Sequence, residues 1–245
     1  MPTSPSSVVR VERQERIWTF VLNRSDKRNA LNAEMVEALL AGLAQAMQTP
    51  QVPMLVFRGE GKSFCAGFDF ADVEQQSEAD LLWRFVRIEQ LLQQIYHWPA
   101  LTLGLAQGKN FGAGVDLWAA CQHRVVASDA SFRMPGLKFG LLLGTRRLGH
   151  LIGMDQARRI QEVAATIDAS EAQTLGLATQ CNEPGQWPDT IATLAQTSIG
   201  LDAATRASLN AALTTDTRDP DLADVVRSLT RPGLKARIAK YRAGQ

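Results

Sequence analysis

The chain has 245 residues, of which 45% are hydrophobic, so it can bury a full core and lies near the upper size of a single domain. Its 26 Lys and Arg residues nearly balance its 25 Asp and Glu residues, for a formal net charge of +1. No global electrostatic field therefore favours nucleic acid or an anionic membrane, and an anionic ligand has to be held by local groups.

The few cysteines and histidines, and the lengths of the apolar runs, indicate which sites and segments we do not expect. Three cysteines and three histidines show no metal-ligand spacing, so we expect no metal site. The N-terminal segment does not combine basic residues with an apolar run, and no apolar run approaches ~20 residues. We therefore expect a cytoplasmic protein with reduced thiols and without a membrane span.

The first predicted elements are a Pro- and Ser-rich N-terminal segment and a β-hairpin. Residues 1–7 are rich in Pro and Ser, which predicts disorder. Segments 8–12 and 16–22 have strand patterns with a short polar connection and predict two paired strands. A polar, basic loop follows at 23–29.

Two amphipathic helices alternate with buried strands in the next part of the chain. Asn32 is a good N-cap for a helix ending near residue 47, and a second helix is predicted over 80–96. Apolar runs at 54–57 and 101–106 have strand length. The predicted buried stripe of the first helix is Met35, Leu39, Leu43 and Met47, and that of the second is Leu81, Phe85, Ile88, Leu92 and Ile95.

Glycine-rich turns follow two of these strands, at 64–69 and 108–121. In the second turn, Gly112 and Gly114 permit close backbone approaches, and a helix that starts near Ala113 presents unpaired N–H groups at its positive end. Such a terminus stabilises an oxyanion, and Asp116 follows on the first turns. The same glycines also fit a turn retained only for packing, and their spacing does not match the dinucleotide-binding G-x-G-x-x-G pattern.

The C-terminal half becomes helical. A strand is predicted at 124–127, an irregular segment at 131–147, and helices near 148–152, 155–165 and 170–176, the last with Ser170 as N-cap and Gly176 as C′ residue. From Trp187 onward only helical patterns occur, with breaks at 214–220 and 231–233. Alternating strands and helices favour an α/β architecture, divided into a core over 8–185 and a C-terminal helical region over 186–245.

These motifs, taken together and in order, resemble the enoyl-CoA hydratase/isomerase (crotonase) family. The resemblance implies a spiral of ββα repeats, with C-terminal helices that form a homotrimer or a dimer of trimers. It also implies an acyl-CoA thioester substrate, so that coenzyme A belongs to the substrate and no cofactor is tightly bound. The matching segments are 23–32, 64–69, 108–121, 131–132 and 170–177.

The resemblance assigns roles to individual residues. The family holds the thioester carbonyl between two backbone N–H groups, which match Phe68 and Ala113 and would stabilise an enolate. Ala71 stands where the family often has a lysine, so Lys235 or Lys240 of the tail is a candidate for a replacement cation. The positions that match CoA-binding ones are Arg24, Lys27, Arg28, Ala66, Gly67, Asp69 and Gly112, although an exposed loop would carry such cations in any case.

The acidic positions depart from the hydratase pattern. Asp116 matches the first catalytic acid but is one methylene shorter than glutamate, and Gly136 stands where hydratases have a second glutamate. Some relatives that make naphthoyl-CoA also have glycine there and fill the gap with bicarbonate. Arg133 and Lys138 flank Gly136, and they either hold an anion or face solvent.

One carboxylate favours double-bond isomerisation or an atypical hydration, with Asp116 as the acid or base. Decarboxylation and hydrolysis remain open. The alternative is a catalytically silent member of the family that binds CoA esters or serves as a scaffold.

Overall fold

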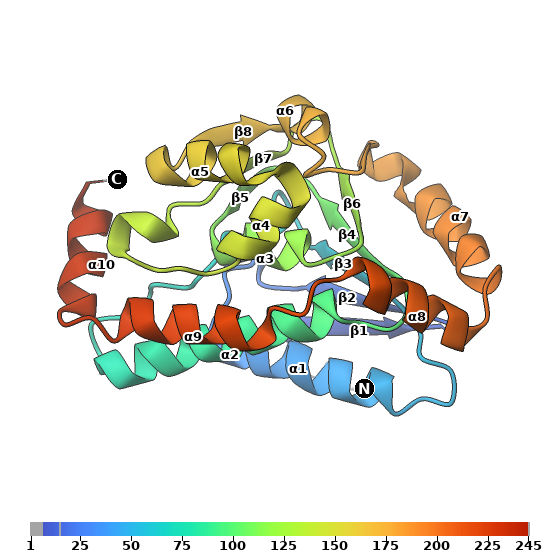
Figure 1. Ribbon diagram of the computed structural model, residues 1–245, viewed down its shortest axis with the longest axis horizontal. Coiled ribbons are helices and arrows are strands. Elements are labelled where there is room, and N and C mark those ends of the chain that lie inside the picture. The colour runs from blue at the N-terminus through green and yellow to red at the C-terminus, as the bar shows by residue number, and fades with distance from the viewer. Residues whose placement is uncertain (1–6, 15, 245) are drawn as a thin grey trace.

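The computed structural model describes residues 7–14 and 16–244. The predicted disorder of residues 1–7 lies outside the described residues except at Ser7, whose carbonyl oxygen accepts a hydrogen bond from the Asn23 amide at 3.0 Å. A six-stranded sheet in the order β1-β2-β3-β4-β6-β9 forms the centre (Figure 1). The predicted hairpin is confirmed, since β1 and β2 pair antiparallel, and the remaining neighbours are parallel. The strands are β1 (Val9–Arg13), β2 (Ile17–Leu22), β3 (Met54–Gly59), β4 (Thr102–Ala106), β6 (His123–Val126) and β9 (Gln180–Cys181).

A second, smaller sheet gives the fold its spiral. It consists of β5 (Lys109–Phe111), β7 (Ser131–Arg133) and β8 (Thr166–Asp168) in the order β5-β7-β8. The chain leaves β4 of the large sheet, enters β5 of the small sheet and then forms α3 (Ala113–Ala119). The next turn repeats this path through β6 and β7 to α4 (Thr145–Ile152), so the expected ββα repeats are confirmed.

Capping and periodicity explain the two long helices. In α1 (Ala33–Met47), the Asn32 side chain accepts a hydrogen bond from the Met35 N–H at 2.9 Å, as predicted. Helix α2 (Glu78–Tyr96) begins with a capping box between Ser77 and Asp80, and its five predicted stripe residues are buried. Met47 is 46% exposed, so its place in the α1 stripe was wrong. Each four-residue step advances about 40° around a helix, and the third step carries Met47 off the buried face.

Helices cover both faces of the large sheet. Helices α1 and α2 pack on one face, and α7 (Trp187–Ile199) contributes Trp187, Ile191 and Leu194 to a separate apolar cluster on the other. Every residue of β4 is buried. This two-sided burial explains why the central strands are continuous apolar runs instead of alternating ones.

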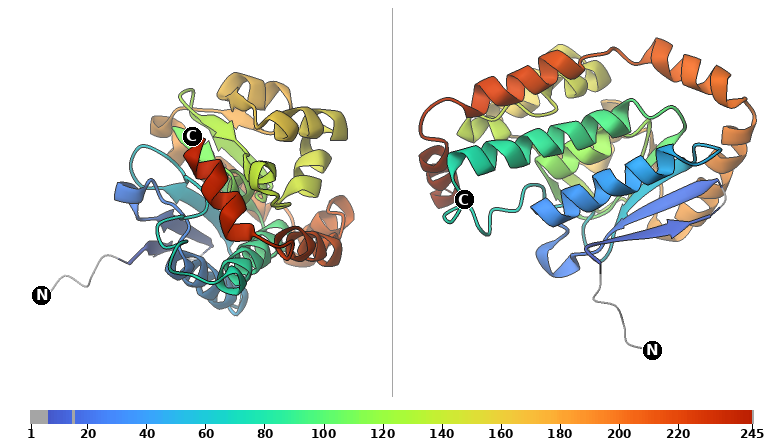
Figure 2. Two further views of the ribbon diagram at one scale, coloured as in Figure 1. Left: turned by 90° about the vertical axis from the view of Figure 1, so that its left-hand side faces the viewer. Right: turned by 90° about the horizontal axis from the view of Figure 1, so that it is seen from below.

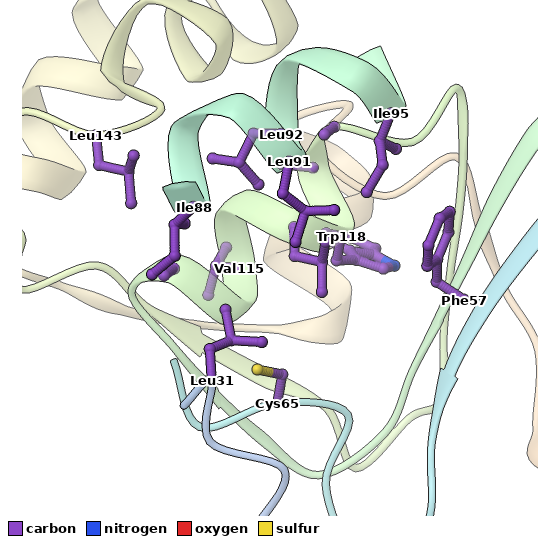
Figure 3. Packing of buried hydrophobic residues seen from close by; sticks show 14 of the residues in the cluster. Leu31, Phe57, Cys65, Ile88, Leu91, Leu92, Ile95, Val115, Trp118 and Leu143 are labelled. Carbon is purple, nitrogen blue, oxygen red and sulfur yellow. The ribbon is translucent and has the colours of Figure 1, made fainter. Parts of the chain in front are cut away.

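Helix α3 lies in the middle of the core, and all seven of its residues are buried. Val115 and Trp118 of α3 lie beside Ile88, Leu91 and Leu92 of α2 (Figure 3). The Trp118 indole donates to the Gly104 carbonyl oxygen at 3.0 Å and stacks on Phe132 with ring centroids 4.7 Å apart. The helix that carries Asp116 is therefore held firmly by its neighbours.

Two predictions for the later part of the chain need correction. Residues 131–147 are not irregular throughout, because they contain β7 and the start of α4; β7 is too short for a periodic signal. Helix α6 (Ala169–Thr174) is capped by Asp168, whose carboxylate accepts from the Glu171 N–H, and not by Ser170. The C′ assignment of Gly176 is confirmed by its φ of +77°.

The C-terminal helices return to the core. Helix α5 (Met154–Val163) follows α4, and the tail continues with α8 (Ala203–Leu213), α9 (Arg218–Leu229) and α10 (Leu234–Ala243). Helix α9 lies along α2, and α10 closes one end of the molecule (Figures 1 and 2). A division of the chain near residue 185 stays a prediction. Among the described residues, no helix is both long and apolar enough to cross a membrane.

Candidate active site

A cavity of about 660 Å³ opens between the basic loop, both glycine turns and α10. Its lining includes eight of the ten residues expected at the site: Lys27, Arg28, Ala66, Phe68, Asp69, Gly112, Ala113 and Asp116. Arg24 and Gly67 lie outside that lining. The fold thus brings into one cavity residues from segments almost a hundred positions apart in sequence.

Glycines allow the two turns to interlock. A Cβ atom on Gly67 would lie 2.3 Å from the Phe111 carbonyl oxygen, and one on Gly114 would lie 2.4 Å from the Cys65 carbonyl oxygen. Gly67 also has a φ of +83°, which disfavours other residues. Because both contacts involve backbone, a side chain at either position would push the two turns apart.

Asn110 connects the turns, and the sequence did not single it out. Its side chain is 1% exposed and accepts a hydrogen bond from the Cys65 N–H at 3.1 Å. The Phe111 N–H donates to the Cys65 carbonyl oxygen at 3.2 Å, and the Gly112 N–H donates to the Arg133 carbonyl oxygen at 2.8 Å. These hydrogen bonds fix the backbone immediately before α3.

Two backbone N–H groups next to these hydrogen bonds have no acceptor in the described part of the chain. Within residues 7–14 and 16–244, neither the Phe68 N–H nor the Ala113 N–H donates to a protein acceptor, although both residues line the cavity. The backbone of Gly67 brings the turns close, since a Cβ atom there would lie 3.4 Å from the Ala113 nitrogen. Paired, unused N–H groups of this kind suit an oxygen that gains negative charge.

The Phe68 side chain anchors its turn in the core. Its ring stacks on Phe85 with centroids 4.2 Å apart, and the Arg84 guanidinium lies 4.0 Å from the Phe68 ring centroid. Arg84 also donates to the Asp69 carbonyl oxygen at 3.0 Å. The bulky residue therefore serves mainly as a core residue, while its backbone N–H belongs to the cavity wall.

Asp116 is a buried carboxylic acid in the same wall. It is 5% exposed, and in the part of the chain that the structure describes its carboxylate accepts no hydrogen bond. Burial raises the pKa of Asp116 well above its ordinary value; the nearby Arg147 opposes this and Glu89 adds to it. A carboxyl group with a raised pKa holds its proton more strongly than an ordinary aspartate, which suits it to act as an acid or base.

Gly144 gives the Asp116 carboxylate its space. A Cβ atom at Gly144 would lie 2.1 Å from Asp116 Oδ1, and the φ of Gly144 is +63°. We expect Gly144→Ala to displace the carboxylate and strain the backbone, lowering turnover at least tenfold and stability by about 1 to 3 kcal/mol. Kinetics and denaturant unfolding measure both effects. Gly185→Ala is the control, because no atom lies within 4 Å of a Cβ there; equal behaviour of the two variants would contradict the role of Gly144.

A buried ion-pair network lies close enough to Asp116 to affect its pKa. Arg147 of α4 contacts Glu89 of α2 at 2.5 and 2.8 Å and Asp221 of α9 at 3.1 Å. The Thr217 hydroxyl donates to Asp221 at 2.7 Å. The network joins three helices and places a positive charge close enough to lower the pKa of Asp116.

Leu141 packs beside Gly136, the position at which a hydratase was expected to have a second acid. A Cβ atom on Gly136 would lie 3.3 Å from the Leu141 carbonyl oxygen and 3.6 Å from Leu141 Cδ2. The Leu141 N–H donates back to the Gly136 carbonyl oxygen at 2.9 Å. The short loop thus packs against Gly136, which still lines the cavity. Of the two flanking cations, Arg133 lines the cavity and donates to the Ala164 carbonyl oxygen, whereas Lys138 is exposed and donates to the Glu162 carbonyl oxygen.

The cations around the cavity differ in part from those expected. Arg24 pairs with Asp69 at 2.9 Å and donates to the Ala30 carbonyl oxygen, so internal partners occupy its guanidinium. Lys235 donates to the Glu74 carbonyl oxygen. Neither Lys235 nor Lys240 is part of the lining, and α10 contributes Tyr241 and Arg242 to it instead. The helical pattern of the tail gave no signal for which of its faces meets the cavity.

The sequence profile of the enoyl-CoA hydratase/isomerase family matches residues 12–227 of the chain. The chain belongs to the enoyl-CoA hydratase/isomerase family. With the enoyl-CoA hydratase domain-containing protein 2, mitochondrial, of Bos taurus it shares 36% identity over 176 residues, which cover 69% of this chain and 60% of that relative. The match thus spans less than two thirds of the curated relative.

A solved structure gives a fuller match. A Bordetella parapertussis protein named for the enoyl-CoA hydratase/isomerase family is 53% identical, covers 97% of this chain and 99% of its own, and has a TM-score of 0.95. The enoyl-CoA isomerase/hydratase fer4 of Mycosarcoma maydis is 29% identical over 66% of this chain and 63% of its own length. The fold is therefore the crotonase fold of this enoyl-CoA hydratase/isomerase family.

Two further expectations for this member of the enoyl-CoA hydratase/isomerase family concern metal and location. Over residues 7–14 and 16–244, no group of His, Cys, Asp and Glu side chains is arranged to hold a metal ion. The cattle relative is mitochondrial by name, and a cytoplasmic location of the present chain stays a prediction.

Proposed function

We propose that the protein binds an acyl-CoA thioester and stabilises its enolate at the Phe68 and Ala113 N–H groups, with Asp116 as the acid or base. The observation that carries this proposal is the presence of two unused backbone donors and one buried carboxyl group in a single cavity. Each donor in such a pair stabilises a developing oxyanion by about 3 kcal/mol. Both are main-chain groups, so the bulky Phe68 side chain does not prevent the role.

One carboxyl group favours proton transfer without a second acid. In a double-bond isomerisation, Asp116 would remove a proton from one carbon, the enolate would form at the two N–H groups, and the same Asp116 would return the proton to another carbon. Hydration needs one group to activate water and one to protonate the α-carbon. Because Gly136 has no side chain that could act as the second acid, hydration by this protein would need an atypical activation of water.

Local cations would hold the coenzyme A part of the substrate. Lys27 and Arg28 of the basic loop and Arg242 of α10 line the cavity, and Lys27 and Arg28 are exposed. The protein has little net charge, so these groups must supply the attraction for the phosphates. In this proposal coenzyme A enters as part of the substrate, and no cofactor is tightly bound.

The tail supports a proposed assembly into a homotrimer or a dimer of trimers. Large apolar side chains are exposed on α7, on α8 and between them, and such groups in one region indicate a protein interface. These residues are Ile199, Leu201, Leu209 and Leu213. Light scattering on the purified protein measures the mass of the assembly.

The decisive test is a panel of thioesters in deuterated water. Enoyl-CoA, β-hydroxyacyl-CoA and malonyl-type CoA esters are incubated with the protein, and products and deuterium at the α-carbon are followed by mass spectrometry. We expect turnover or α-deuteration of at least one ester. Binding of these esters without turnover or deuteration would instead support a catalytically silent CoA-ester-binding or scaffolding member, the candidate that the missing second acid at Gly136 favours.

A further inference from the structure

Gln161 of α5 is a buried polar side chain that the proposed chemistry leaves unexplained. It is 5% exposed and lines the cavity that contains Asp116. Within the described residues its amide makes no hydrogen bond with protein. Among the described residues only Gln107 Oε1 and Arg206 Nε are fully enclosed without a partner, so the Gln161 amide is open to the cavity. A polar ligand in the cavity can therefore supply its missing hydrogen bonds.

A second cavity, of about 300 Å³, begins at the same place. The two linings share Leu137, Thr145 and Gln161, so these residues form the boundary between the cavities. In the described part of the chain, the Thr145 hydroxyl likewise has no hydrogen-bond partner. The boundary therefore presents two unused polar side chains, one from α4 and one from α5.

This polar boundary lies just beyond the expected reaction centre. The Gly144 backbone is so close to Asp116 that a Cβ atom would lie 2.1 Å from Oδ1, and Thr145 is the next residue. The rest of this wall is apolar and includes Leu137, Leu141 and Leu143. A hydrocarbon acyl chain would pack against those leucines but would leave the Gln161 amide without a hydrogen-bond partner.

We propose that Gln161, with Thr145, binds a hydroxyl or carbonyl oxygen on the acyl group, so that the protein prefers oxygenated acyl-CoA thioesters over hydrocarbon ones of equal length. This inference rests on the proposed thioester function. An amide and a hydroxyl can each donate and accept, which matches a neutral oxygen. A carboxylate fits this pair less well, because neither Gln161 nor Thr145 carries the positive charge that would offset its burial.

Inert CoA thioethers test this preference without any turnover. We would measure by calorimetry the Kd of hexyl-CoA thioether and of its hydroxylated and keto counterparts, with the oxygen at successive carbons beyond the β-position. The wild-type protein should bind at least one oxygenated analogue tenfold or more tightly than the plain one. Gln161→Leu should bind the two within about threefold of each other, because a lost hydrogen bond to a buried group removes about this selectivity.

Two variants complete the design. Gln156→Leu is the matched control, since Gln156 lies on the same helix, accepts from Arg159 at 2.9 Å and lines neither cavity; it should keep the wild-type preference. Thr145→Val should reduce the preference even if Gln161→Leu fails to fold. Equal wild-type affinity for plain and oxygenated analogues overturns the inference alone. Failure of every thioether to bind overturns the proposed thioester function as well.

Discussion

Replacing Asp116 with Asn should reduce turnover of the preferred thioester by about 10² to 10⁴, the usual contribution of a positioned acid or base. Asn keeps the shape of the side chain but does not exchange a proton, and the Phe68 and Ala113 N–H groups remain in place. Thioester binding should therefore stay within a few fold of wild type. Steady-state kinetics and calorimetry on the same preparation separate the two effects.

The control for this variant is Asp155→Asn, because Asp155 is exposed on α5 and lines neither cavity. It should leave kcat unchanged. If Asp116→Asn retained full activity towards every accepted thioester, the assignment of Asp116 as the acid or base would be wrong.

The same substitution should stabilise the fold at neutral and alkaline pH. Burial raises the pKa of Asp116 in the folded state above its value in the unfolded chain, so ionisation of this group destabilises the folded protein. The difference in Tm between Asp116→Asn and wild type should be small below about pH 4, near the ordinary pKa of aspartate, and should grow as the pH rises towards the raised pKa. A difference independent of pH would contradict the buried, ionisable state.

The pattern of the sequence predicted the elements whose stability is local. The cap of α1, the spacing of the apolar residues of α1 and α2, and the β1–β2 hairpin are visible in the sequence. Strands β5, β7 and β8 have three residues each, too few for any periodicity. They are stabilised by pairing with one another, which the sequence does not display.

The site was predictable to a similar extent. The glycine turns marked Phe68, Ala113 and Asp116, and the structure brings these residues to one cavity. The absence of a second acid at Gly136 was also visible, but the packing of Leu141 against Gly136 was not. Gln161 gave no signal because its importance comes from a missing partner, which only a folded structure reveals.

The ion-pair network near Asp116 could not be predicted from the sequence either. Arg147 pairs with Glu89 and Asp221, which lie 58 and 74 residues away in sequence. No spacing rule connects such positions. The network nevertheless has a large effect on stability, because a buried ion without its partner strongly destabilises the folded state.

Arg147→Met should destabilise the protein by about 3 to 5 kcal/mol, the cost of leaving buried charges uncompensated. Arg147 is 3% exposed and Glu89 is fully buried, so water cannot replace the lost partner. Denaturant unfolding measures the loss. The matched control is Arg146→Met on the same helix: Arg146 also pairs with Asp221 and with Asp224, but it is partly exposed, and its loss should cost about 1 kcal/mol or less.

The same variant separates a structural from an electrostatic role of Arg147 in catalysis. Arg147 lowers the pKa of Asp116, whereas Glu89 raises it, so removal of the arginine should move the pKa of Asp116 further upward. The pH profile of kcat/KM should then shift to higher pH, while Arg146→Met leaves it in place. A uniform loss of activity without any shift would show that Arg147 only holds α2, α4 and α9 together. A shift to lower pH would contradict the electrostatic coupling, because the remaining Glu89 carboxylate favours the protonated form of Asp116.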